Sequence, residues 1–186
     1  MLVLASASPR RRELLTQAGF SFTVQPAEID EDWREGEGPA AYVERLAREK
    51  AAAVFSSLAA RDAELRVLGA DTTVTLEDAI LGKPVDAADA ARMLRLLSGR
   101  RHRVMTGIAL ATANGVRSAV ETTVVEFDAL GEEEIAAYVA SGEPMDKAGA
   151  YGIQGLAAKW IPRIEGCYFN VVGLPLARLR ALLREG

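Results

Sequence analysis

The feature that most constrains the fold of this chain is a turn between two long β-rich runs. Residues 102–130, HRVMTGIALATANGVRSAVETTVVEFDAL, place Asn114-Gly115 between two stretches rich in Val, Thr and Ala. Asn-Gly is favoured in two-residue hairpin loops, because the central residues of that turn need positive φ. The sequence therefore predicts an antiparallel hairpin around Asn114-Gly115.

Strands and helices alternate on both sides of this hairpin. The strand LVLAS precedes a helix over residues 9–18, and the β-rich stretch RVLGADTTVTL follows a long helix over 39–60. Further helices are predicted from Asp86 to about Ser98, within GEEEIAAYVASGEP, and from about Pro175 onwards. This alternation together with a hairpin predicts an α/β fold with a mixed sheet. Because no repeat or linker interrupts it, we expect residues 1–186 to form a single domain.

Charge and composition exclude several classes of function. With 22 basic and 26 acidic residues the net charge is −4, which argues against a general nucleic-acid or anionic-membrane surface. No apolar run approaches the roughly 18 residues that a membrane span needs, and the start MLVLASAS lacks the basic segment of a signal peptide. Cys167 is the single cysteine, so no intramolecular disulfide can form. We therefore expect a cytoplasmic protein.

The turn SASPRRREL places positive charge where a helix disfavours it. Ser8 is predicted as the N-cap and Pro9 as the first helical residue, so the arginines at 10–12 occupy the first turn. The helix dipole makes a cation there unfavourable by about 0.3–1 kcal/mol. The turn is therefore either a solvated, arginine-rich helix end or a site for an anion such as a polyphosphate.

Charged residues next to apolar segments are the next candidates. Lys50 falls on the apolar stripe of the predicted helix over 39–60, where its stem either lies along the core edge or meets an anion in a cleft. Asp71 follows an apolar β-rich run and is flanked by small residues, which leave room for a ligand. This position favours binding of a hard cation or acceptance of a proton from water. The acids Glu28, Asp30 and Glu31 are either a solvated loop or the source of one carboxylate that shares a divalent metal with Asp71.

Other polar residues carry weaker signals. Lys83 lies beside the turn LGKP, and alone it is uninformative. The segment KAGAYGIQG is either a flexible loop or a backbone that a flat ligand approaches closely, and the Gln154 carboxamide matches the carbonyl and imide N–H of a pyrimidine. His102, the single histidine, lies in the basic stretch GRRHRV and is predicted to be solvated. One histidine and one distant cysteine disfavour nucleophilic triads and zinc cages, which leaves carboxylates, a hard metal and cations for any hydrolysis.

Ordered motifs resemble a known family. LASASPRRRELL, LAREKA, GADTTV, LGKP, DKAGAYGIQG and VVGLPL occur in this order between residues 4 and 176. They closely resemble the Maf family of nucleoside triphosphate pyrophosphatases, relatives of the inosine triphosphate pyrophosphatases. The resemblance implies an elongated mixed sheet flanked by helices, with two lobes around a nucleotide cleft. It also implies hydrolysis of a nucleoside triphosphate to the monophosphate and pyrophosphate with Mg²⁺ or Mn²⁺.

The resemblance assigns roles to individual residues. It implies that Asp71 accepts the proton of the attacking water. The resemblance and the residue chemistry together predict that Glu31 and Asp71 share the metal and that Arg10 and Arg11, with the helix N-terminus, hold the phosphates. The family's other polar active-site positions correspond to Ser8, Arg11, Glu31, Lys50 and Lys83. The positions that mark the branch acting on dTTP and UTP correspond to Arg10, Thr72 and Gln154.

Alternatives remain open from the sequence alone. One is a non-enzymatic nucleotide-binding regulator of septum formation, with a role in cell-division arrest, and another is the branch that uses 7-methyl-GTP. A nucleic-acid-binding domain is disfavoured by the acidic net charge and the lack of a base-stacking aromatic pattern. The resemblance also allows a homodimer. The sequence does not choose between dTTP, UTP and modified pyrimidine nucleotides, or between Mg²⁺ and Mn²⁺.

Overall fold

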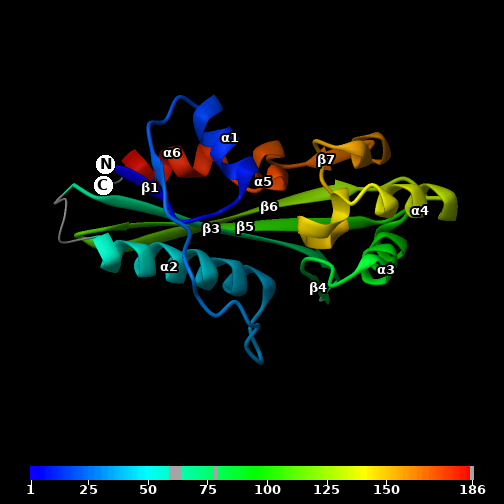
Figure 1. The fold of residues 1–186 in the computed structure, drawn as a ribbon, viewed down its shortest axis with the longest axis horizontal. Coiled ribbons are helices and arrows are strands. Elements are labelled where there is room, and N and C mark those ends of the chain that lie inside the picture. The colour runs from blue at the N-terminus through cyan, green and yellow to red at the C-terminus, as the bar shows by residue number, and fades with distance from the viewer. Residues whose placement is uncertain (59–63, 78, 185–186) are drawn as a thin grey trace. The chain divides into compact units, whose positions relative to one another are not determined.

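The computed structural model of the chain describes residues 1–58, 64–77 and 79–184 (Figure 1). The strands are β1 (Leu2–Leu4), β2 (Thr23–Val24), β3 (Arg66–Leu76), β4 (Ala79–Leu81), β5 (Arg101–Thr112), β6 (Gly115–Glu126) and β7 (Arg163–Glu165). The α-helices are α1 (Pro9–Gln17), α2 (Pro39–Leu58), α3 (Ala87–Leu97), α4 (Glu132–Ala140), α5 (Tyr168–Val172) and α6 (Leu176–Arg184). Short 3₁₀ helices are η2 (Glu143–Asp146), η3 (Ala148–Ala150) and η4 (Leu156–Trp160).

The strands form one mixed sheet, as the sequence predicts. Their order is β2-β1-β3-β5-β6-β7, with β4 paired to β3. Strand β1 pairs in parallel with β2 and β3, whereas β4 runs antiparallel to β3 and β7 antiparallel to β6. The predicted hairpin is confirmed, because β5 ends at Thr112 and β6 begins at Gly115, whose φ is +113°. The α/β class with a mixed sheet is therefore confirmed.

Most predicted helices are confirmed, with shifts at their ends. The long helix begins at Pro39 and is described to Leu58, and the last two residues of its predicted range, 59–60, lie outside the described residues. The C-terminal helix begins at Leu176. Helix α5 and the 3₁₀ helices were not predicted, because such short segments carry too little periodicity. Within the described ranges, no helix is long and apolar enough to cross a membrane.

The chain divides into two compact units, each assembled from several segments. Unit 1 comprises Met1–Thr72, Thr106–Glu121 and Gly173–Gly186, and unit 2 comprises Thr73–Met105 and Thr122–Val172. In unit 1, α2 covers one face of the sheet, and α1 and α6 lie on the other (Figure 1). A buried apolar cluster lies between α2 and the strands. Its members include Val3, Ala47, Ala51, Val67 and Ala109.

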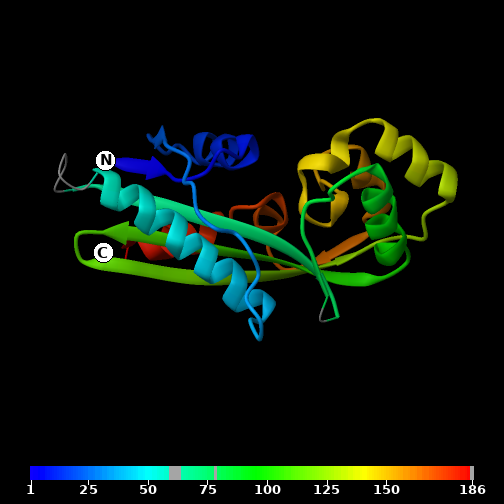
Figure 2. The same ribbon diagram turned by 60° about the horizontal axis from the view of Figure 1, so that its bottom comes forward.

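Two glycines let α2 approach the sheet closely. A Cβ on Gly69 of β3 would lie 2.1 Å from Ala47 O, and one on Gly107 of β5 would lie 2.3 Å from Val43 O. Figure 2 shows α2 from a second side, lying along the strands that carry these glycines. A side chain at either position would displace the helix backbone, so the absence of Cβ atoms sets the height of α2 above the sheet. That height decides where polar residues on the inner face of α2 can reach.

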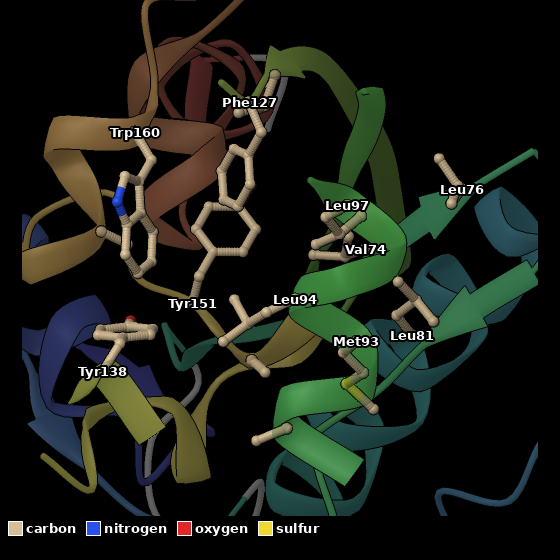
Figure 3. Close-up of a cluster of buried hydrophobic side chains, with 14 of the residues drawn as sticks. Val74, Leu76, Leu81, Met93, Leu94, Leu97, Phe127, Tyr138, Tyr151 and Trp160 are labelled. Atoms are coloured by element: carbon tan, nitrogen blue, oxygen red, sulfur yellow. The ribbon is translucent and has the colours of Figure 1, made fainter. Parts of the chain in front are cut away.

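Unit 2 has its own apolar core, built around aromatic rings (Figure 3). Phe127 and Tyr151 meet edge to face at 4.7 Å between ring centroids, and Tyr138 and Trp160 do so at 5.1 Å. Aliphatic side chains of β3, β4 and α3 complete this core, among them Val74, Leu81, Met93 and Leu94.

His102 belongs to this core, so the prediction of a solvated histidine is wrong. The ring is 2% exposed, and its Nε2 lies 2.7 Å from the hydroxyl of Tyr151. Side chains alternate along β5, which points His102 and Val104 inward while Arg101 and Arg103 remain exposed. The basic neighbours that indicated a surface position therefore lie on the other face of the same strand. Burial lowers the pKa of His102 to about 4.

Candidate active site

The turn before α1 has the local structure that the sequence predicts. Ser8 is the N-cap, its Oγ accepts a hydrogen bond from Arg11 N at 3.4 Å, and Pro9 is the first helical residue. No acidic residue lies in the first turn of the helix. The helix dipole and the arginines at 10–12 therefore place positive charge at the same end of α1.

Arg11 is held by four hydrogen bonds within unit 1. Its Nε donates to Gly173 O at 2.9 Å, and its Nη1 donates to Ser6 Oγ at 3.1 Å and to Ala70 O at 3.0 Å. Its Nη2 donates to Thr72 Oγ1 at 3.0 Å. Burial lowers the pKa of Arg11, and the negative charge of Asp71 partly offsets this. Because these acceptors come from the segment after β1, from β3 and from the residue that follows α5, the guanidinium joins three parts of the chain.

Lys50 joins the two carboxylates that the sequence singles out. Its Nζ lies 2.7 Å from Asp71 Oδ1 and 2.8 Å from Glu31 Oε1. The residue is 7% exposed, so the ammonium group lies within unit 1 rather than in open water. The Asp71 side chain is 13% exposed, whereas that of Glu31 is 54% exposed. The structure therefore brings together an acid from β3, an acid from a loop and a lysine from α2.

Thr72 links this acid–lysine cluster to the arginine. It directly follows Asp71 on β3, and its Oγ1 accepts from Arg11 and lies 2.9 Å from Thr106 Oγ1 on β5. Successive strand residues point to opposite faces, so Asp71 faces α2 while Thr72 faces Arg11. The candidates of unit 1 thus lie on both faces at one position along β3.

The other two candidates, Lys83 and Gln154, belong to unit 2. Both side chains are exposed. Gly149 N donates to Gly82 O at 3.0 Å, which ties the turn carrying Lys83 to the glycine-rich segment carrying Gln154. Gln154 lies in a four-residue turn closed by a hydrogen bond of 3.1 Å from Gly155 N to Gly152 O. The structure therefore joins the two segments within unit 2.

The glycine-rich segment is held in place rather than being a free loop. Glu143 accepts hydrogen bonds from the hydroxyl of Tyr138 at 2.9 Å and from Leu156 N at 3.1 Å and 3.2 Å. The Tyr138 hydroxyl in turn accepts from Gly152 N at 3.2 Å. A Cβ on Gly155 would lie 2.0 Å from Glu143 Oε1, so a side chain there would displace the Glu143 carboxylate. Both sides of the Gln154 turn are fixed by this pair of side chains.

The whole chain, residues 1–186, matches the family model described as Maf-like protein. The chain belongs to the Maf family. The dTTP/UTP pyrophosphatase of Shewanella oneidensis is 54% identical to it over 189 residues, which cover 99% of this chain and 97% of that protein. The dTTP/UTP pyrophosphatase of Moorella thermoacetica is 55% identical over 186 residues, covering 98% and 93%.

A solved structure also resembles this Maf protein. The nucleoside-triphosphatase / dITP/XTP pyrophosphatase of Mycobacterium abscessus has a TM-score of 0.45 and 16% identity to it. The similarity covers 99% of this chain and 96% of that one.

The carboxylates that the structure brings together are the candidate ligands for the expected divalent metal. Among the described residues, no group of three or more His, Cys, Asp or Glu side chains is placed to hold a metal ion. Asp71 and Glu31 do converge on one point, the Nζ atom of Lys50. Mg²⁺ is commonly bound by one or two carboxylates together with substrate phosphates, so the chemistry of these oxygen donors fits Mg²⁺ or Mn²⁺, while the point on which they converge is taken by the Lys50 ammonium group.

Some residues that shape the site were missed in the sequence. Tyr42, Arg45 and Glu37 fix the loop carrying Glu31, and Glu143 fixes the turn carrying Gln154. The spacing of Tyr42, Arg45 and Glu49 places them on one polar stripe of the helix, which the sequence does contain. Such a stripe is typical of any solvated helix face, so it gave no signal for function.

Proposed function

We propose that this Maf protein hydrolyses the pyrimidine nucleoside triphosphates dTTP and UTP to the monophosphate and pyrophosphate. The observation that carries the proposal is the convergence of Asp71 and Glu31 on the buried ammonium group of Lys50. The names of full-length relatives that are more than half identical support the same reaction. In it, water attacks the α-phosphorus and the bond from that phosphorus to the α–β bridging oxygen breaks, so the electron pair leaves with pyrophosphate.

Within this proposal Asp71 is the proton acceptor. Its carboxylate is mostly buried and hydrogen-bonded to a lysine on one oxygen, which leaves the other oxygen available to a water molecule. A divalent ion held by Glu31 and Asp71 would supply charge neutralisation at the phosphates. Lys50 orients both carboxylates and adds positive charge where charge develops on the leaving pyrophosphate.

The remaining candidates bind substrate in this proposal. Arg10 and the N-terminus of α1 bind phosphate oxygens, Lys83 neutralises the leaving pyrophosphate, and Gln154 pairs with the pyrimidine edge. For Arg11 we propose a role other than the predicted phosphate binding, because four of its N–H groups are donated to protein acceptors. We assign it to shaping the turn and orienting Thr72. The homodimer also stays a prediction.

The test is pyrophosphate release by the wild type and by Asp71→Asn. With Mg²⁺ or Mn²⁺ present, we expect release from dTTP and UTP in preference to 7-methyl-GTP and the purine nucleotides, and its loss in the variant. Circular dichroism and a thermal melt show whether the variant keeps its fold. Near-normal turnover by folded Asp71→Asn would contradict the assignment of the base. No release from any nucleotide by folded, metal-supplied wild type would favour the regulator of septum formation instead.

A further inference from the structure

The backbone around Glu31 is fixed by side chains of α2. Residues 25–38, all of which the structure describes, contain no helix or strand, and the Glu31 side chain is 54% exposed. An ion pair with one solvent-exposed partner contributes little by itself, so the contact of Glu31 with Lys50 is too weak to order this loop. We propose that Arg45, together with Tyr42, is a positioning residue that holds the loop so that Glu31 meets Lys50 beside Asp71. The inference rests on the proposed function.

Two consecutive carbonyl groups of the loop are bound by one turn of α2. The hydroxyl of Tyr42 donates to Glu31 O at 2.9 Å, and Arg45 Nη2 donates to Asp32 O at 3.0 Å. Tyr42 and Arg45 are three residues apart, so they lie on the same face of the helix. The Arg45 guanidinium also lies over the Tyr42 ring, with its Cζ 5.6 Å from the ring centroid. These contacts fix the peptide on the C-terminal side of Glu31.

The same guanidinium closes the far end of the loop. Arg45 Nε donates to Glu37 Oε1 at 2.7 Å and Arg45 Nη2 to Glu37 Oε2 at 2.8 Å, a two-pronged ion pair. Both side chains are shielded, at 13% and 11% exposed, so water weakens this pair less than a surface pair. Its hydrogen bonds lower the pKa of Glu37 and raise that of Arg45. Glu49 Oε2, 3.2 Å from Arg45 Nη1, steadies the guanidinium from the helix side.

Arg45 therefore spans the loop from Asp32 to Glu37, and its guanidinium donates to Asp32, Glu37 and Glu49 rather than to Asp71. If Arg45 acts through Glu31, removing Arg45 lowers activity because the Glu31 carboxylate is misplaced. That loss of activity disappears in a variant that lacks the Glu31 carboxylate. A residue that only stabilises the fold lowers activity equally in either background. This difference separates positioning from general stability.

The experiment combines Arg45→Met with Glu31→Gln in the full chain. We expect Arg45→Met to lower kcat/KM for dTTP by about 10–100-fold, the usual size for residues that orient metal ligands. In the Glu31→Gln background the same change should lower kcat/KM by less than about 3-fold. Tyr42→Phe removes a single hydroxyl without loss of packing. It should lower kcat/KM by less than Arg45→Met does, and this loss should also disappear in the Glu31→Gln background.

Arg48→Met is the matched control. It removes the same charge from the same helix, but Arg48 donates to Val116 O at 3.2 Å and to Ser118 Oγ at 2.9 Å rather than to the loop. We expect near wild-type kcat/KM for this variant. An equal loss in Arg45→Met and Arg48→Met would overturn the inference.

Tryptophan fluorescence gives a readout that does not depend on activity. Trp33 lies in the loop, 53% exposed, and its Nε1 donates to Glu37 O at 2.8 Å, whereas Trp160 is 4% exposed in unit 2. Acrylamide quenching of Trp33 should increase in Arg45→Met and remain unchanged in Arg48→Met. Unchanged quenching, or a loss of kcat/KM that is the same with and without Glu31, would overturn the inference. An inactive wild type would instead refute the proposed function, and the quenching would still decide whether Arg45 orders the loop.

Discussion

Arg11→Met is expected to destabilise this Maf protein strongly, although the residue lies at an arginine-rich helix start. The guanidinium donates to two hydroxyls and to the carbonyls of Gly173 and Ala70. Hydroxyls can rotate towards other partners, but each carbonyl loses a charged donor. At about 1–3 kcal/mol for each group left unsatisfied, the free energy of unfolding should fall by about 2–6 kcal/mol. For a chain of this length, each kcal/mol lowers Tm by about 2–4 °C.

Arg12→Met provides the comparison for this prediction. Arg12 shares the first turn and the charge, but its side chain is exposed. Removing a cation from the N-terminus of a helix should leave stability unchanged or raise it by up to about 1 kcal/mol. Urea unfolding followed by far-UV circular dichroism measures both variants.

The refuting result is specific. If Arg11→Met unfolds at the same urea concentration as Arg12→Met and the wild type, the four hydrogen bonds do not stabilise the fold. Loss of pyrophosphate release without loss of stability would then favour the sequence prediction that Arg11 holds the phosphates.

Two further predictions concern unit 2. The pKa of His102 is lowered from 6.5 to about 4, so the unfolded chain binds the proton more tightly than the folded chain does. The free energy of unfolding is therefore highest above pH 6.5 and falls by about 3 kcal/mol as the pH drops to 4. Urea unfolding from pH 4 to 7 should show this slope in the wild type and not in His102→Gln, and equal slopes would contradict it. Gly155→Ala should raise KM for UTP several-fold, because the added Cβ displaces Glu143. Gly131→Ala is the control, because a Cβ at that position has room and should leave KM unchanged. Equal KM values for the two variants would refute this close-packing argument.

Much of the fold follows from local signals in the sequence. The Asn114-Gly115 turn, the cap at Ser8 and the apolar stripe of α2 each depend on neighbours within a few residues, and all are confirmed. The prediction of a solvated His102 is wrong because a strand sends alternate residues to opposite faces, so its basic neighbours lie on the other face of β5. Burial on a strand depends on what packs above it, which local sequence does not contain.

The candidate site was predictable only as a set of residue types. Lys50 and Asp71 were singled out because each is a charge among apolar residues, and the structure joins them at 2.7 Å. Their meeting depends on how closely α2 lies on the sheet, which Gly69 and Gly107 decide from two different strands. Arg45 remained hidden, because its partners lie 8 and 13 residues away on an irregular loop. No periodic pattern connects a helix to such a loop.

The arginines at 10–12 show that cations placed where the helix dipole disfavours them do not by themselves reveal which groups compensate for the cost. Consecutive helical residues point about 100° apart, so three adjacent cations face three different surroundings. Arg11 turns into unit 1, where carbonyl and hydroxyl oxygens supply the partial negative charge that the helix N-terminus lacks. Arg10 contributes to the lowered pKa of Arg11 by charge repulsion. A phosphate bound at this turn, as we propose, would reduce that repulsion as well as interact favourably with the helix dipole, so the partly buried Arg11 would favour phosphate binding by Arg10.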